Sequence, residues 1–118
     1  MTKIKIMIVD DLEHVREGLQ TIFSLIEDIE VVCEACNGSE AVSLVEKYHP
    51  NIILMDLEMP KIDGFEATQL IKKSNPLVGI VAMSIHHTPD IQERAISAGC
   101  DAFLRKGVPT DLLIDTIR

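Results

Sequence analysis

One stretch of the sequence constrains the fold more than any other, the segment NIILMDLEMP at residues 51–60. Its four consecutive apolar residues, Ile52–Met55, are too few for a helix and stand between two prolines, which favours a strand buried on both faces. The apolar run ends in a carboxylate, Asp56, and a second acid, Glu58, follows two residues later. Because open parallel sheets bind ligands at the carboxyl ends of their strands, Asp56 is the first candidate functional residue.

The rest of the chain alternates between strand and helix patterns. Short apolar runs predict strands at residues 3–9, 29–35, 52–55, 79–83 and 102–104. Apolar residues at helical spacing predict helices that begin near residues 13, 39, 63, 88 and 109, with Ser39, Asp63 and Thr88 as expected N-caps. Strict alternation demands a parallel sheet with helices on both faces, and therefore one α/β domain over residues 1–118.

The segment at residues 29–35 differs from the other strands because only half of it is apolar. Simple alternation puts Val31, Cys33 and Ala35 on one side and Glu30 and Glu34 on the other. A strand with one polar side is typical of the edge of a sheet, so we expect this segment to be an edge strand.

Composition excludes several classes of partner. The formal net charge is −8, which disfavours non-specific binding to nucleic acid or to an anionic membrane. No apolar run reaches the length of a membrane span, and the sequence predicts a cytosolic protein without a membrane partner. Cys33 and Cys36 form a CxxC, but residues three apart in a strand point to opposite faces. With Cys100 they are expected to be reduced structural thiols rather than a redox or metal site.

Polar side chains follow the predicted strands at their carboxyl ends. The first strand ends at Asp10 and Asp11, the third at Asp56 and the fourth at Ser84, and the fifth leads into Lys106. Clustered carboxylates repel one another, which raises their pKa values unless a cation is present, and hard oxygen ligands suit Mg²⁺. A lysine and a hydroxyl group add a charge and a hydrogen bond for phosphoryl oxygens.

Several motifs resemble the receiver domain of two-component response regulators. IMIVDD, LMDLEMPKIDG, AMS and FLRK occur in the order and at the spacing typical of that family, over residues 3–118. VREGL and EACNGSEAV further resemble the NarL/FixJ class of DNA-binding regulators, whose output domain is a LuxR-type helix-turn-helix. The resemblance implies a flavodoxin-like, doubly wound sheet of five parallel strands in the order 2-1-3-4-5, with helices on both faces.

The resemblance also implies a chemical role for each acid at the strand ends. Asp56 matches the phosphoacceptor, whose carboxylate attacks the phosphohistidine of a sensor histidine kinase. Asp11 and Asp56 are then expected to bind Mg²⁺ directly, together with the backbone carbonyl group of Glu58, while Asp10 acts largely through water. Lys106 matches the residue that pairs with Asp56 and later with the phosphoryl group.

Other residues are expected to transmit or modulate the signal. Ser84 matches the hydroxyl residue that moves to the phosphoryl group, and Phe103 matches the aromatic residue that turns inward behind it. His86 lies in the loop after Ser84, where we expect it to be solvated and to influence how long the phosphoryl group survives. The family usually follows its lysine with a cis proline, but Lys106 is followed by Gly107, so a trans bond is expected here.

Three other functions remain open on the sequence. A haloacid-dehalogenase-like phosphatase also uses a strand-end Asp with Mg²⁺, but its motif needs an Asp where this chain has Glu58. A pseudo-receiver that only docks would not need the complete set of acids, Ser84 and Lys106. Nucleotide binding is less favoured, because no glycine-rich loop follows the first strand.

The sequence also predicts how the domain is used. The final helical pattern reaches Arg118 without a Gly, Asn or Pro to stop it, so we expect a DNA-binding output domain beyond this chain. DNA would then be contacted only through that absent domain, since the receiver itself is acidic. Control by masking and by formation of a homodimer, or a stand-alone receiver, are both compatible with the sequence.

Overall fold

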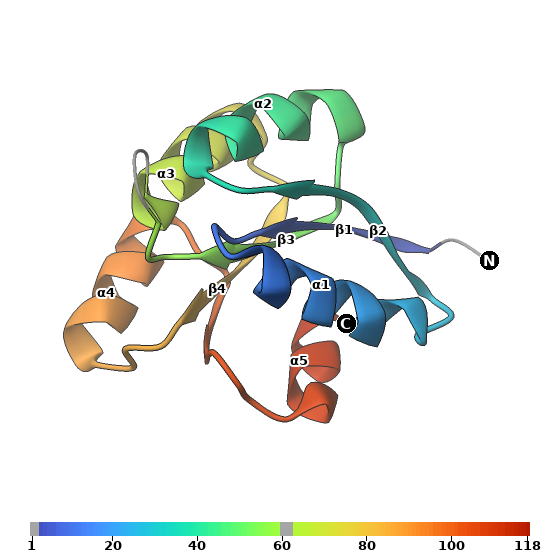
Figure 1. Ribbon diagram of the computed structural model, residues 1–118. Coiled ribbons are helices and arrows are strands. Elements are labelled where there is room, and N and C mark those ends of the chain that lie inside the picture. The colour runs from blue at the N-terminus through green and yellow to red at the C-terminus, as the bar shows by residue number, and fades with distance from the viewer. Residues whose placement is uncertain (1–2, 60–62) are drawn as a thin grey trace.

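The computed structural model describes residues 3–59 and 63–118, so residues 60–62 of the LMDLEMPKIDG motif lie outside the described part. Strands and helices alternate along the described chain (Figure 1). The strands are β1 (Ile4–Val9), β2 (Ile29–Ala35), β3 (Ile52–Asp56), β4 (Gly79–Ser84) and β5 (Ala102–Arg105). The helices are α1 (Glu13–Ser24), α2 (Gly38–Tyr48), α3 (Gly64–Ser74), α4 (Pro89–Ala98) and α5 (Thr110–Ile117).

The five strands form one parallel sheet in the order β2-β1-β3-β4-β5. This order confirms the predicted flavodoxin-like fold and the predicted edge position of β2. The central strand β3 has neighbours on both sides, which explains why its sequence is a continuous apolar run. Helices α2, α3 and α4 cover one face of the sheet, and α1 and α5 cover the other (Figure 1).

Alternate residues of the inner strands supply two separate apolar cores. On β3, Ile53 and Met55 face the core beneath α2 and α3, whereas Leu54 faces the core beneath α1 and α5. All three side chains are fully buried. The one aromatic side chain that is fully buried, Phe23 of α1, belongs to the second core. A core of aliphatic side chains was expected from the low aromatic content, 3%.

The two sides of β2 do not follow simple alternation, and this part of the prediction is wrong. Ile6 pairs with Val31 and Met7 pairs with Cys33, so the register skips one residue of β2. This irregularity turns Val31 toward the core under α1 and α5, and Cys33 and Ala35 toward the opposite core. A β-bulge of this kind shifts all later residues to the other face of the sheet.

Polar caps begin three of the helices. Asn37, not the predicted Ser39, caps α2, because its side chain accepts a hydrogen bond from the backbone N–H of Glu40 at 2.8 Å. Asp63 and Thr88 cap α3 and α4 as predicted. The α4 helix ends at a glycine, Gly99, with a φ of 109°, a left-handed conformation that favours glycine.

The cysteines and the helix lengths agree with two further expectations. Cys33, Cys36 and Cys100 are all free thiols, and burial raises the pKa of Cys33 to about 11, which keeps this thiol protonated. Among residues 3–59 and 63–118, no helix is both long and apolar enough to cross a membrane.

Candidate phosphoacceptor site

The carboxyl ends of the strands meet at one edge of the sheet. Parallel register aligns Asp56 with Met83 on β4, and Ser84 with Arg105 on β5, so these strands end level with one another. The backbone N–H of Lys106 then donates to the carbonyl oxygen of Ser84 at 2.9 Å, which fixes the start of the β5–α5 loop. The predicted site residues that meet at this edge are Asp10, Asp11, Asp56, Glu58, Ser84 and Lys106.

Lys106 lies between two buried carboxylates. Its Nζ is 3.1 Å from Oδ2 of Asp10 and 3.2 Å from Oδ1 of Asp56. Burial opposes the charged form of Lys106, but the hydrogen bond to Asp10 and the charges of both carboxylates leave its pKa above the ordinary value. The lysine was expected to pair with Asp56, and the structure adds Asp10 as an equally close partner.

Asp56 has one satisfied and one unsatisfied oxygen. Its Oδ1 accepts hydrogen bonds from the backbone N–H of Glu58 at 3.0 Å and from Lys106. Its Oδ2 is buried and has no hydrogen-bond partner among the described residues. Burial, followed by the nearby charge of Asp10, raises the pKa of Asp56 to about 6 despite the opposing effects of Lys106 and the Glu58 N–H. The carboxylate is therefore costly to bury and is left with one oxygen available for chemistry.

The acids at this edge form a set that fits a divalent cation. Asp10, Asp11 and Asp56 each offer an oxygen, and these oxygens lie within 4.8 Å of one another. Oxygens on opposite sides of a magnesium ion lie about 4 Å apart, so the spacing is close to that of a shared ion. Asp10 and Asp56 are buried, whereas Asp11 is exposed, so one side of the cluster is open to solvent. The unsatisfied Oδ2 of Asp56 is a further sign that the residues present fit a cation or a phosphoryl group.

Arg16 holds the turn that carries the first two acids, a role that the sequence analysis did not anticipate. Its guanidinium group donates to the backbone carbonyl oxygen of Asp10 at 2.6 Å and to Oε1 of Glu34 at 3.1 Å. The Oδ1 of Asp10 also accepts a hydrogen bond from the N–H of Leu12 at 2.9 Å. These contacts tie the Asp10–Asp11 turn to α1 and to the end of the edge strand. An arginine in the first turn of the helix that follows two acids was the available sequence signal.

Glu58 reaches across to the end of β4 with its side chain. Its Oε1 accepts a hydrogen bond from the hydroxyl group of Ser84 and another from the N–H of Ile85 at 3.2 Å. The Nε2 of His86 lies 3.7 Å from the other carboxylate oxygen, although the His86 side chain is 63% exposed. The sequence analysis assigned a role only to the backbone carbonyl group of Glu58, and the direction of its side chain could not be predicted.

Phe103 lies on β5 beside the loop that follows β4. Its half-buried ring stacks on His87 with 4.9 Å between centroids and an angle of 13° between planes. The hydroxyl group of Ser84 accepts a hydrogen bond from the N–H of His86 at 3.0 Å, which orients the start of the same loop. Ser84 and Phe103, the two predicted switch residues, are therefore both in contact with one short loop.

Two glycines shape the backbone around the site. A Cβ atom at Gly64 would overlap the carbonyl oxygen of Asp56, so glycine allows α3 to begin directly against the end of β3. Gly107 has a φ of 87°, which favours glycine after Lys106. The Lys106–Gly107 bond is trans, as expected for a bond that lacks proline.

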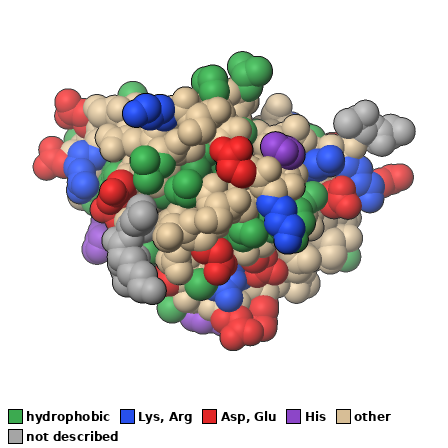
Figure 2. Space-filling view, turned by 90° about the horizontal axis from the view of Figure 1, so that it is seen from above, with side chains coloured by type: hydrophobic (Ala, Val, Ile, Leu, Met, Phe, Trp, Pro, Cys, Tyr) green, Lys and Arg blue, Asp and Glu red, His purple; other side chains and the backbone are tan. Residues whose placement is uncertain are grey.

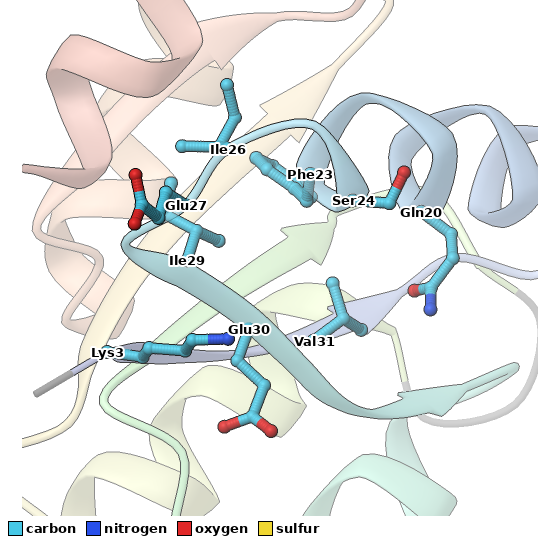
Figure 3. A pocket seen from close by; sticks show the side chains of 9 residues that line it. All are labelled: Lys3, Gln20, Phe23, Ser24, Ile26, Glu27, Ile29, Glu30 and Val31. Atoms are coloured by element: carbon cyan, nitrogen blue, oxygen red, sulfur yellow. The ribbon is translucent and has the colours of Figure 1, made fainter.

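Surface charge elsewhere does not form a basic binding face in the view available. Figure 2 shows the face seen from above, where Lys and Arg side chains are separated by acidic and apolar side chains. A pocket of about 300 Å³ lies near the amino-terminal end of β2 and contains none of the predicted site residues (Figure 3). Its charged members, Lys3, Glu27 and Glu30, come from three different segments.

The fold and the site together define a class of protein, a doubly wound α/β domain with a buried acidic site at the carboxyl ends of its strands. A family model described as the response regulator receiver domain matches residues 6–118, and the chain belongs to this family. It is therefore a regulatory phosphoacceptor domain of the two-component type, and a haloacid-dehalogenase-like phosphatase is not favoured.

Individual relatives agree with the predicted subclass. The transcriptional regulatory protein DegU of Brevibacillus brevis is 38% identical over 116 residues, which cover 98% of this chain and 49% of DegU. The response regulator VraR of Staphylococcus epidermidis is 37% identical over 115 residues, covering 98% of this chain and 55% of VraR. A solved LuxR-family response regulator from Aurantimonas sp. SI85-9A1 superposes with a TM-score of 0.93 at 30% identity, covering 98% of this chain and 83% of that one. The likeness to NarL/LuxR-type regulators is confirmed, and the chain spans about half the length of the curated relatives it matches.

Proposed function

We propose that this chain receives a phosphoryl group on Asp56 from the phosphohistidine of a sensor kinase and passes the signal to an output domain. The observation that carries the proposal is the buried Oδ2 of Asp56, which has no hydrogen-bond partner among the described residues. A carboxylate oxygen left without a partner beside a lysine is a candidate nucleophile. Since the pKa of Asp56 is about 6, the side chain is largely ionised at neutral pH, as a nucleophile must be.

In the proposed reaction, Oδ2 of Asp56 attacks phosphorus while Oδ1 stays hydrogen-bonded to the N–H of Glu58. The P–O bond forms as the P–N bond of the phosphohistidine breaks, and the electron pair returns to the imidazole of the kinase. Lys106, already 3.2 Å from Asp56, is placed to pair with a phosphoryl oxygen. Self-catalysed transfer and hydrolysis are the only chemistry we assign to the chain.

The acids would hold Mg²⁺ during the transfer. We assign direct contacts to Asp11, to Asp56 and to the backbone carbonyl group of Glu58, with Asp10 acting largely through water. Support comes from the three acid oxygens that lie within 4.8 Å of one another. When bound, the ion would offset negative charge that accumulates between the carboxylates and the phosphoryl oxygens. Arg16 would keep the Asp10–Asp11 turn in place through its bond to the Asp10 carbonyl oxygen.

Ser84 and Phe103 form the switch in this proposal. For Ser84 to meet the phosphoryl group, its hydroxyl group must leave the carboxylate of Glu58. Movement of Ser84 would disturb the loop that also holds His87 against Phe103, so the change would reach β5. His86, close to Glu58 and largely exposed, is placed to influence access of water to the phosphoryl group.

The output is proposed to be binding of DNA through a further domain. The named relatives include a transcriptional regulatory protein, and each is about twice as long as this chain. With a net charge of −8, the receiver would leave contact with DNA to that domain and would act by masking it and by forming a homodimer.

Intact-mass analysis tests the acceptor. We expect the full chain, incubated with Mg²⁺ and a small phosphodonor, to gain the mass of one phosphoryl group, and the gain to disappear in Asp56→Asn. Asp28→Asn, a matched change at the opposite end of the sheet, should be phosphorylated like the wild type. An unchanged phosphoryl adduct in Asp56→Asn would overturn the assignment.

A further inference from the structure

A cavity of about 200 Å³ lies on the α1 and α5 face of the sheet, directly beside the acidic site. Its wall comes from β1, α1, β3, β4 and the β5–α5 loop. Five aliphatic side chains line it, namely Ile8, Val15, Leu19, Leu54 and Met83. The cavity is more enclosed than the pocket of Figure 3, which also has several charged residues around it.

We propose that this cavity binds a small uncharged apolar molecule of about the size of a substituted benzene ring. An apolar cavity of about 150 Å³ in another protein stays dry and accepts benzene, so a cavity somewhat larger can hold a ring with one or two extra carbons. An aliphatic wall provides few of the two to four hydrogen bonds that a buried water needs. An apolar occupant would instead gain contacts with these side chains and remove their surface from water.

Charge at one end of the cavity sets the chemical class of the occupant. Asp10, Asp56 and Lys106 also line it, and the two carboxylates outnumber the single ammonium group. That ammonium group is already paired with both acids at 3.1 and 3.2 Å, so no free cation remains among these residues to receive an anionic ligand. A ring that carries a carboxylate is therefore excluded, whereas the same ring without charge fits. This inference concerns binding alone and does not depend on phosphorylation of Asp56.

Toluene and benzoate are matched probes for the test. We expect toluene to cause saturable shifts in the methyl NMR signals of Ile8, Leu19, Leu54 and Met83, and benzoate to cause none. Leu19→Trp places a larger side chain in the cavity and should abolish the toluene shifts. Val15→Phe is the second filling variant, in case Leu19→Trp does not fold. Leu12→Phe is the control, since Leu12 lies just before α1, is 45% exposed and does not line the cavity.

Retention of toluene binding by Leu12→Phe, and its loss in a folded filling variant, would support the site. The proposal is overturned if the wild-type methyl signals do not respond in a saturable way to toluene. It is equally overturned if folded filling variants bind toluene as the wild type does, or if benzoate binds in the same place with equal affinity.

Discussion

The two ends of the sheet each hold an aspartate paired with a cation, but the two pairs have opposite electrostatics. At the carboxyl end, Asp56 is 2% exposed and burial raises its pKa to about 6 even though Lys106 is 3.2 Å away. At the amino end, Asp28 pairs with Arg118 at 2.7 Å, and this hydrogen bond lowers the pKa of the aspartate.

The comparison separates the effect of pairing from the effect of burial. A salt bridge at the surface favours the charged form of both partners but contributes little to stability. In the interior, desolvation exceeds what one ammonium group can offset when it is shared by two carboxylates. The carboxyl end is thus electrostatically incomplete and can gain from a bound cation, whereas the amino end is not. Each prediction below tests this difference.

The largest effect is expected from Lys106→Ala. Loss of the ammonium group leaves Asp10 and Asp56 without their shared partner and removes a contact to the incoming phosphoryl group. We expect phosphorylation by a small phosphodonor to slow by about 100-fold or more, the typical cost of removing one such electrostatic contact. Lys106→Arg should recover part of the rate, measured by intact mass over time. A rate equal to that of the wild type in Lys106→Ala would show that the lysine is not part of the reaction.

Asp56→Asn should stabilise the protein at neutral pH. The folded-state pKa of about 6 lies above the unfolded value of 3.8, so the folded state binds the proton more tightly. Stability is therefore lost as pH rises from about 4 to about 6, by up to about 3 kcal/mol in the absence of a cation. Asn has no such titration, so its free energy of unfolding from urea denaturation should exceed that of the wild type at pH 7 and match it more closely near pH 4.

Asp28→Asn is the matched control for that experiment. Because the pKa of Asp28 is lowered, this residue contributes stability above its unfolded pKa and loses it as pH falls, the opposite direction. The change should be small, since the pair with Arg118 is exposed to solvent. If both variants shifted stability in the same direction and by the same amount, burial would not explain the behaviour of Asp56.

Ser84→Ala should separate phosphorylation from its relay. The nucleophile and Lys106 are unchanged in this variant, so we expect the phosphoryl group to be accepted. The hydroxyl group that would move from Glu58 to the phosphoryl group is absent, so α4, β5 and α5 should not respond. Hydrogen exchange of that region, with and without phosphodonor, is the measurement. A response like that of the wild type would mean that the relay does not pass through Ser84.

The smallest effect is expected from His86→Ala, which should change the lifetime of the phosphoryl group by a few-fold. His86 is exposed and touches the site only through Glu58 at 3.7 Å, so an influence on water access is the expected mechanism. Decay of the phosphorylated chain after removal of phosphodonor gives the rate. His87→Ala is a neighbouring control that alters the contact with Phe103 instead. Equal decay of His86→Ala and the wild type would remove His86 from the proposal.

Strand order and the position of the site could be predicted because they depend on patterns that are local in the sequence. The alternation of strands and helices requires a parallel sheet, and a parallel sheet brings residues such as Asp10, Asp56 and Lys106 to one edge whatever the details of packing. Burial of β3 was likewise evident from its four apolar residues, Ile52–Met55.

Other features depend on contacts between distant segments and had no local signal. The bulge that separates Val31 from Cys33 arises from pairing of β2 with β1, which no pattern within β2 records. Arg16 reaches the Asp10 carbonyl oxygen only because α1 docks at a particular rotation. The bond from Ser84 to the side chain of Glu58 depends on a rotamer of a residue outside any helix or strand. The clustering of acids predicted a raised pKa for Asp56, but burial rather than repulsion is its main cause.

The most direct test of the central claim is to locate the phosphoryl group among the three clustered acids. Borohydride reduces an acyl phosphate to homoserine, which marks the modified aspartate permanently for peptide mapping. After treatment with Mg²⁺ and phosphodonor, our account predicts homoserine at position 56 and unmodified Asp10 and Asp11. Homoserine at position 10 or 11, or an unmodified Asp56 in a chain that has gained the phosphoryl mass, would contradict it.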